Sequence, residues 1–326
     1  MLLSPATAKE LMVNRTIALL FPGQGSQSIG MGKDLSDKYP IARQTFEEAD
    51  EALGTKLSQL CYEGPEDQLR LTENTQPAIL TVSVAAWRVL EEKGIEPAFV
   101  AGHSLGEYSA HVAGRTLTFA DAVRAVRNRG KYMQEAVPVG TGAMAAILGM
   151  QFDAVSAICR GASQGEVCEP ANINSPEQIV ISGHAAAVER AVKLADERGA
   201  KRAKLLSVSA PFHCSLMKPA QERLAIDLNH LQFSPPRIPV VCNVDASPVE
   251  DTERSREALI RQVTGSVKWN ESMQWLIAHG VQTFVEVGPG KVLCGLMRQI
   301  DRSKKCLNVE DEASLHKTME FFAAST

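Results

Sequence analysis

The spacing of apolar residues in the first half of the chain alternates between two patterns. Short continuous apolar runs at Thr16–Phe21 and Ala98–Ala101 are typical of buried parallel strands. Longer segments with apolar residues at helical spacing predict helices at Ala42–Leu53, Pro77–Lys93 and Leu117–Gln134. Because strands alternate with helices, the pattern predicts an α/β fold, with a doubly wound body built on a parallel sheet.

The pattern changes between residues 140 and 208, where short strands become frequent. It predicts the order strand, helix, strand, strand, helix, strand, over Gly142–Met150, Asp153–Arg160, Val167–Ile173, Gln178–Ser182, Ala185–Glu197 and Ala203–Ser207. This βαββαβ order is that of ferredoxin-like domains. We therefore expect a main body made of residues 1–139 and 209–326, with a small ferredoxin-like subdomain inserted at residues 140–208.

After this insert the chain returns to the first pattern. The expected elements are the strands Pro239–Val244 and Gln282–Val287 and the helices Asp251–Val263, Glu271–His279 and Val292–Ile300. The pattern is weakest over residues 303–326. Residues 1–14 are expected to be a short extension before the first strand.

The composition is that of an ordinary globular domain and limits the choice of partners. Of 326 residues, 44% are hydrophobic and 22% are charged, and the net charge is −4. A nucleic acid or an anionic membrane requires a basic surface, so neither is expected as the main partner. No apolar run approaches the length of a membrane span, and no signal-peptide pattern is present, so we expect a cytoplasmic protein.

Seven cysteines are scattered along the chain, and no two of them form a Cys-x-x-Cys pair. An odd number without metal-ligand spacing argues against a disulfide framework or a zinc site. We therefore expect reduced thiols and no bound metal.

The pentapeptide Gly102-His103-Ser104-Leu105-Gly106 lies between a predicted strand and a helix-compatible run. A Gly-x-Ser-x-Gly turn in this context predicts a nucleophile elbow, in which the serine hydroxyl stands clear of the sheet. The alternative is an ordinary glycine-rich turn whose serine only caps the helix.

A serine nucleophile needs a base, and the chain offers seven histidines. His213 lies in a turn-like stretch just after the insert, and the serine-then-histidine order favours it. Asp245 is a candidate for the carboxylate of a triad, although a turn role suits it as well. A serine–histidine pair oriented by a backbone carbonyl or an amide is equally workable.

Attack on an acyl carbon also needs donors for the developing oxyanion. In an elbow one donor is the backbone N–H after the nucleophile, here that of Leu105. The glycine-rich loop around Gln24 suits the second donor, because glycines let the backbone approach a ligand closely. A phosphate loop is excluded, since the third glycine of its motif would fall at Ser28 and no Gly-Lys-Ser/Thr follows.

Three arginines, Arg124, Arg127 and Arg129, cluster on the helix that follows the elbow. A guanidinium binds a carboxylate through two parallel hydrogen bonds, so one of them suits an acidic substrate. Their spacing does not choose among them, and a solvated basic helix face explains the cluster equally well.

Several ordered blocks of sequence resemble the malonyl-CoA:acyl carrier protein transacylases and the acyltransferase domains of polyketide synthases. They are Phe-Pro-Gly-Gln-Gly-Ser-Gln (21–27), Gly-His-Ser-Leu-Gly-Glu-Tyr (102–108), Arg-Gly-Lys-Tyr-Met-Gln-Glu-Ala (129–136), Ala-Asn-Ile-Asn-Ser-Pro (171–176), Pro-Phe-His-Cys-Ser-Leu-Met (211–217) and Val-Glu-Val-Gly-Pro-Gly (285–290). The resemblance covers almost the whole chain after Asn14. It implies an α/β-hydrolase-like body with a ferredoxin-like insert.

The resemblance also implies catalytic roles. Ser104 is the nucleophile that becomes acylated, and His213 is the base and later the acid. Gln262 orients His213 through its backbone carbonyl, so no acidic third member is needed. The backbone N–H groups of Gln24 and Leu105 form the oxyanion hole.

The same resemblance assigns the groups that meet the substrate. Arg129 holds the malonyl carboxylate, while Asn172 and His103 line or support the site. In related polyketide acyltransferases a bulky residue before the histidine accompanies malonyl, so Phe212 favours malonyl over methylmalonyl.

The implied activity is that of an S-malonyltransferase with ping-pong kinetics. Its partners are malonyl-CoA and acyl carrier protein; coenzyme A enters as a substrate thioester, and no cofactor is expected. A monomer is the default. The alternatives are a serine hydrolase or thioesterase acting on the same thioesters, and a non-catalytic scaffold.

An acidic carrier protein is expected to dock on a basic patch. The candidate patches are Lys201–Lys204 and Arg298 with Lys304 and Lys305. Solvated surface charge explains each of them equally well.

Overall fold

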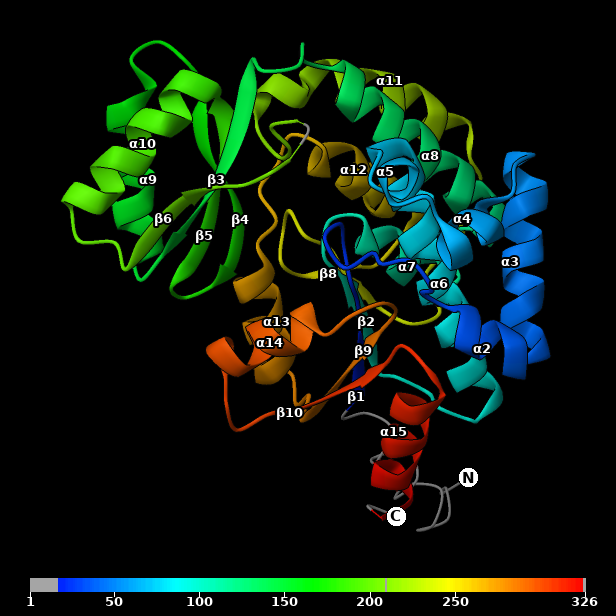
Figure 1. Ribbon diagram of the computed structural model, residues 1–326. Coiled ribbons are helices and arrows are strands. Elements are labelled where there is room, and N and C mark those ends of the chain that lie inside the picture. The colour runs from blue at the N-terminus through cyan, green and yellow to red at the C-terminus, as the bar shows by residue number, and fades with distance from the viewer. Residues whose placement is uncertain (1–16, 209, 325–326) are drawn as a thin grey trace.

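The computed structural model describes residues 17–208 and 210–324, so the expected extension at residues 1–14 lies outside it. A six-stranded sheet of order β10-β9-β1-β2-β7-β8 forms the centre of the main body (Figure 1). Its neighbouring strands are parallel except for the edge pair β7 and β8. The strands are β1 (Ile17–Phe21), β2 (Phe99–Gly102), β7 (Val240–Val241), β8 (Pro248–Val249), β9 (Thr283–Val287) and β10 (Lys305–Val309).

Helices cover both faces of this sheet, which explains why its central strands are continuously apolar. On β1, Leu19 and Phe21 belong to the cluster on the α6 side, whereas Ala18 and Leu20 belong to the cluster with α13 and α14. The helices of the body are α2 (Lys33–Lys38), α3 (Pro40–Leu53), α4 (Leu57–Glu63), α5 (Glu66–Leu69), α6 (Thr72–Glu92), α7 (Gly106–Ala113), α8 (Phe119–Glu135), α11 (Lys218–His230), α12 (Thr252–Gln262), α13 (Trp269–Ala278), α14 (Val292–Ile300) and α15 (Glu312–Ala324), with a 3-10 turn at Ser215–Met217.

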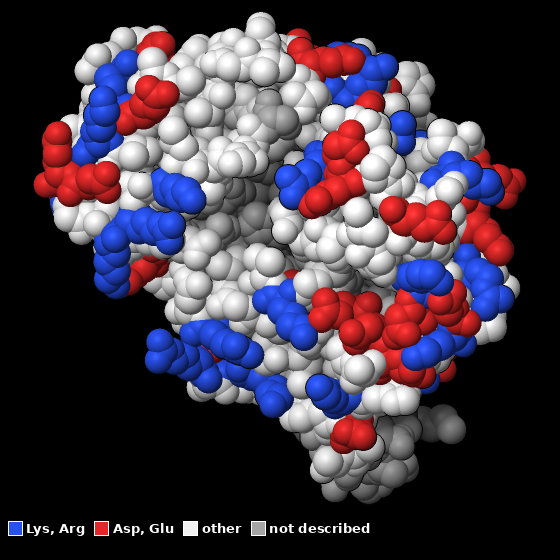
Figure 2. Space-filling model, in the orientation of Figure 1, with Lys and Arg blue, Asp and Glu red and all other residues white. Residues whose placement is uncertain are grey.

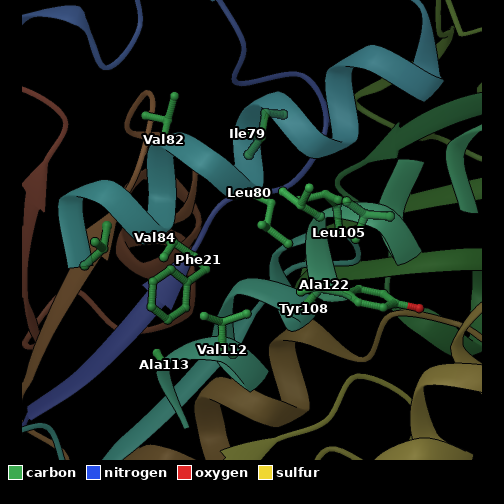
Figure 3. Packing of buried hydrophobic residues seen from close by; sticks show 14 of the residues in the cluster. Phe21, Ile79, Leu80, Val82, Val84, Leu105, Tyr108, Val112, Ala113 and Ala122 are labelled. Atoms are coloured by element: carbon green, nitrogen blue, oxygen red, sulfur yellow. The ribbon is translucent and has the colours of Figure 1, made fainter. Parts of the chain in front are cut away.

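The long helix α6 lies in the middle of the larger core. Figure 3 shows side chains of α6 near the end of β1 and the start of α7. They are Ile79, Leu80, Val82 and Val84 of α6, Phe21 of β1, and Leu105 and Tyr108 at the start of α7. These side chains are almost fully buried. The turn that carries Ser104 therefore lies beside the larger apolar core of the molecule.

The second sheet is antiparallel and has the order β4-β5-β3-β6. Counted within the insert, this is the strand order of a ferredoxin-like fold, and its own apolar core holds α9 and α10 against the strands. The elements are β3 (Gly142–Leu148), α9 (Phe152–Ser163), β4 (Cys168–Ser175), β5 (Gln178–His184), α10 (Ala185–Glu197) and β6 (Arg202–Leu205). The predicted fold class is confirmed, while the boundaries 140 and 208 of a separate subdomain stay a prediction.

Most predicted elements are present with ends shifted by a few residues, but two predictions were wrong in extent. Helix α6 begins at Thr72, and Pro77 lies inside it. Because proline is frequent in the first turn of a helix, Pro77 is a natural place to expect the start, but the helix begins five residues earlier. The strand expected at Pro239–Val244 is only Val240–Val241, because the chain turns from Cys242 to Ser247 to form the edge pair with β8.

The expectation that all cysteines are free thiols was also wrong. Cys294 on α14 and Cys306 on β10 form a disulfide, with Cα atoms 5.4 Å apart. The other five cysteines are free and buried. Because the two partners are 12 residues apart and belong to different elements, no local spacing rule identifies the pair.

Candidate active site

The turn between β2 and α7 has the sharp geometry of a nucleophile elbow. Ser104 has a φ of 51°, a conformation that side-chain-bearing residues rarely adopt. A Cβ on Gly102 would lie 1.9 Å from the backbone of Gly106, and a Cβ on Gly106 would lie 2.0 Å from the carbonyl oxygen of Phe21. Only glycine fits at both positions, so the two glycines permit the turn that exposes the serine.

His213 lies directly against this serine. The hydroxyl oxygen of Ser104 is 2.7 Å from Nε2 of His213, although 109 positions separate them in sequence. On the other side of the ring, Nδ1 is 2.9 Å from the carbonyl oxygen of Gln262 and 3.2 Å from that of Gly265. Because carbonyls only accept, Nδ1 carries the proton and Nε2 is left to accept the proton of the hydroxyl.

Backbone carbonyls thus hold the imidazole where a triad would have a carboxylate. Asp245, the candidate acid, instead pairs with Arg261 at 2.9 Å and is not hydrogen-bonded to His213. Burial, and after it the charge of Arg129, lowers the pKa of His213 to about 3. The imidazole is therefore neutral near pH 7, as a general base must be.

The two expected oxyanion donors lie at the same cleft, which has a volume of about 600 Å³. Neither the Leu105 N–H nor the Gln24 N–H donates to another described residue. The loop comes so close to the elbow that a Cβ on Gly23 would lie 2.5 Å from the carbonyl oxygen of His103. Both N–H groups are consequently available at one end of the cleft.

Of the three arginines on α8, Arg129 alone is buried, with 1% of its surface exposed. Its guanidinium donates to Gln76 Oε1 at 2.8 Å, to the Ser104 hydroxyl oxygen at 3.1 Å and to Gln262 Oε1 at 2.9 Å. Within the described residues it has no carboxylate partner. A buried cation beside the nucleophile, held only by neutral groups, is suited to an anionic substrate.

The remaining predicted residues, His103, Asn172 and Phe212, all line the cleft. Nε2 of His103 is 2.8 Å from Oδ1 of Asn174, so this ring supports the turn and leaves the hydroxyl to His213. Burial lowers the pKa of His103 as well.

The structure adds polar residues that sequence reasoning missed. Asn243 accepts from the Ser104 N–H at 2.8 Å and donates to the Gly102 carbonyl at 2.7 Å, which ties both sides of the elbow to the end of β7. Gln76 is a buried polar residue near the start of α6, and Glu107 directly follows the Gly-x-Ser-x-Gly pentapeptide. A polar residue directly before a helix predicted to be apolar, and an acid near the candidate nucleophile, were the features of the sequence that could have pointed to Gln76 and Glu107.

No group of three or more His, Cys, Asp or Glu side chains in the described part of the chain could hold a metal ion. None of the helices described is long and apolar enough to cross a membrane.

Comparison with known proteins places this geometry in a family. A model of the acyl transferase domain matches residues 18–319. The malonyl CoA-acyl carrier protein transacylase of Salmonella typhimurium is 51% identical over 284 residues, which cover 87% of this chain and 92% of the relative. The enzyme of the same name from Bacillus subtilis is 50% identical over 93% of this chain and 96% of its own length.

Solved structures agree in fold. An acyl carrier protein S-malonyltransferase from Vibrio cholerae has a TM-score of 0.92 and 49% identity, over 93% of this chain and 99% of that chain. A malonyl-transacylase in complex with its type II PKS acyl-carrier protein has a TM-score of 0.91 and 47% identity, over 93% of this chain and 99% of that chain. The chain belongs to the acyl transferase family and, within it, to the malonyl CoA-acyl carrier protein transacylases.

Proposed function

We propose that the protein transfers a malonyl group from malonyl-CoA to the phosphopantetheine thiol of acyl carrier protein, with Ser104 as the residue that carries the group. One observation supports this most strongly. The hydroxyl oxygen of Ser104 lies 2.7 Å from a neutral imidazole and 3.1 Å from a buried guanidinium that has no carboxylate partner among the described residues. A nucleophile, its base and a carboxylate-binding group thus meet at one point of the cleft.

In the first half-reaction, the Ser104 hydroxyl gives its proton to Nε2 of His213 while its oxygen attacks the thioester carbon. The N–H groups of Gln24 and Leu105 donate to the oxyanion of the tetrahedral intermediate. When that intermediate collapses, the carbon–sulfur bond breaks, and the coenzyme A sulfur takes the proton from His213. The acyl-serine ester remains.

Arg129 binds the carboxylate of the malonyl group during this step. Its charge is the second cause, after burial, of the low pKa of His213. A substrate carboxylate paired with Arg129 offsets that charge and makes His213 a stronger base. An acyl group without a carboxylate lacks both effects, so Arg129 contributes to the choice of substrate and to the rate of acylation.

In the second half-reaction, His213 removes the proton of the carrier thiol, and the sulfur attacks the acyl-serine ester. The carbon–oxygen bond breaks, and Ser104 regains a proton from His213. One thioester is exchanged for another, so the reaction needs no redox group and no nucleotide energy, and we propose no cofactor. Double displacement gives ping-pong kinetics.

Hydrolysis of the same acyl-serine is the competing activity. Incubation with labelled malonyl-CoA, with and without phosphopantetheinylated acyl carrier protein, separates the two. We expect the label to move to the carrier thiol and little free malonate to appear when the carrier is absent. Rapid release of malonate that does not depend on the carrier would identify a hydrolase.

Two basic areas are candidates for binding the acidic carrier. Figure 2 shows Lys and Arg side chains gathered over α14 and β10, and again over the outer subdomain, on either side of the hollowed centre. Lys201 pairs with Glu177, and Lys304 donates to Gln282, which leaves Arg202, Lys204 and Arg298 as the more available charges. We propose that a monomer docks the carrier across this hollow.

Charge reversal tests the two areas separately. Arg298→Glu and Arg202→Glu should be compared for transfer to the carrier and for acylation by malonyl-CoA. The variant at the true docking surface loses carrier transfer and keeps acylation. Equal loss in both half-reactions would reject docking as the cause.

A further inference from the structure

The buried charge of Arg129 connects to one buried acid, Glu107 on α7, which has no role in the steps above. The link is the side-chain amide of Gln262. Its Oε1 accepts from Arg129 at 2.9 Å, while its Nε2 donates to Oε2 of Glu107 at 2.8 Å and to the carbonyl oxygen of Ser104 at 2.9 Å. The carboxyl of Glu107 is fully buried and also accepts from the Asn243 N–H at 2.9 Å.

The second oxygen of this carboxyl lies in an unusual position. Oε1 of Glu107 has no hydrogen-bond partner among the described residues, and neither has Nε2 of His111, which lies 4.0 Å away. Both side chains are fully buried.

The protonation of His111 follows from its other nitrogen. The Thr116 hydroxyl donates to the carbonyl oxygen of His111 at 2.9 Å, so its oxygen must accept from Nδ1–H of that ring at 2.7 Å. Burial lowers the pKa of His111 to about 3, which keeps the ring neutral. Nε2 therefore presents a lone pair to Oε1 of Glu107, and only a proton on the carboxyl would give this contact a donor.

Provided that Arg129 binds the malonyl carboxylate as proposed above, we propose that Glu107 is the positioning residue that balances the charge of this site by taking up a proton when the substrate arrives. Without substrate, ionised Glu107 offsets Arg129 through Gln262. When the malonyl carboxylate reaches Arg129, one proton from solvent binds Oε1 of Glu107, and the new O–H faces Nε2 of His111. No other bond changes.

The groups around Glu107 place this titration near neutral pH. Burial raises the pKa of Glu107 to about 7, while the Asn243 N–H, the Gln262 amide and the charge of Arg129 on α8 act to lower it. From the segment after β7, Asp245 raises it, while burial and then the charge of Glu107 raise the pKa of the Cys242 thiol. The remaining titratable neighbours are His111, which is neutral, and Tyr108, whose pKa burial raises, so that its phenol also stays neutral.

Proton uptake on binding tests the proposal. The full chain carrying Ser104→Ala binds malonyl-CoA without reacting, and calorimetry in buffers of different ionisation heat gives the number of protons taken up. Acetyl-CoA is the matched ligand, because it carries the same nucleotide phosphates and no carboxylate. At a pH above the pKa of Glu107, we expect the binding of malonyl-CoA to take up more protons than the binding of acetyl-CoA. At a pH well below that pKa, the two ligands should take up equal numbers.

Adding Glu107→Gln to this variant should abolish the difference between the two ligands at every pH, because the amide copies the protonated carboxyl. A difference that survives Glu107→Gln would overturn the proposal. If Glu107→Gln does not fold, the affinities of the Ser104→Ala protein decide. The ratio of malonyl-CoA to acetyl-CoA affinity should fall by up to about tenfold per pH unit above that pKa, and a constant ratio contradicts the proposal.

Arg129→Ala in the same background separates the two hypotheses. If that change leaves malonyl-CoA affinity intact, the role of Arg129 is wrong. If affinity is lost but the original protein shows no proton uptake, the role of Glu107 alone is wrong.

Discussion

Replacing Arg129 by alanine should reverse the substrate preference of the enzyme. The change removes a buried guanidinium that lies 3.1 Å from the Ser104 hydroxyl. Leaving one partner of a buried charge pair without the other costs about 3–5 kcal/mol. At about 1.4 kcal/mol per tenfold change, kcat/KM for malonyl-CoA should fall by roughly a hundredfold to a few thousandfold.

Uncharged acyl groups should respond in the opposite direction. The charge of Arg129 lowers the pKa of His213, so its removal makes the imidazole a stronger base. Turnover of acetyl-CoA should therefore stay constant or rise. Release of coenzyme A from each substrate, measured for both proteins, gives the ratio of the two kcat/KM values.

Arg124→Ala is the matched control, because Arg124 is on the same helix, its side chain is 54% exposed, and its ion pair is with Asp121. This change should leave both substrates unaffected. A malonyl-to-acetyl ratio that is the same in Arg129→Ala and in the unaltered protein would refute the reasoning, provided that thermal melts show both proteins folded.

Three further experiments test the elbow, the base and the acyl pocket. Gly106→Ala places a Cβ 2.0 Å from the Phe21 carbonyl and should destabilise the protein by at least about 1–3 kcal/mol. Gly295→Ala meets nothing within 4 Å inside α14 and should stabilise by about 0.5–1 kcal/mol; denaturant unfolding compares the two, and equal stability contradicts the packing argument. Because the pKa of His213 is lowered to about 3, labelling of the free enzyme by an uncharged fluorophosphonate should stay flat as the pH falls through about 6.5, where an ordinary imidazole would lose reactivity. A decline with its midpoint there would show that the base is unperturbed. Phe212→Ser should narrow the preference for malonyl-CoA over methylmalonyl-CoA by about 10- to 200-fold, and an unchanged ratio of kcat/KM values would remove Phe212 from the acyl pocket.

The parts of the fold that sequence predicts well are those governed by neighbouring residues. The apolar runs of β1 and β2 reflect burial on both faces, and Gly102 reflects a close approach to Gly106 within the same turn. Gly106 is different, because the carbonyl of Phe21 on β1 excludes a side chain there. The start of α6 was missed because burial in the core, rather than the local preference of Pro77, decides where that helix begins.

The site was predictable to the extent that residue type limits the chemistry. The serine turn identified a nucleophile locally, and chain order favoured His213, but spacing did not choose among the arginines. The structure distinguishes them by burial, since Arg129 faces inward and Arg124 faces solvent.

The supporting network was not predictable from sequence in the same way. Asn243 lies 139 positions from Ser104, and Gln262 lies 155 positions from Glu107. These contacts depend on how β7 and α12 pack against α7, and that packing leaves no local pattern in the sequence. The disulfide between α14 and β10 was missed for the same reason.

Intact-protein and peptide mass spectrometry after brief exposure to malonyl-CoA tests the proposed chemistry most directly. We predict one malonyl group, located on the peptide that contains Ser104, lost on addition of phosphopantetheinylated carrier protein, and absent from Ser104→Ala. Transfer that persists in Ser104→Ala, or a malonyl group on any other residue, would contradict the proposed mechanism.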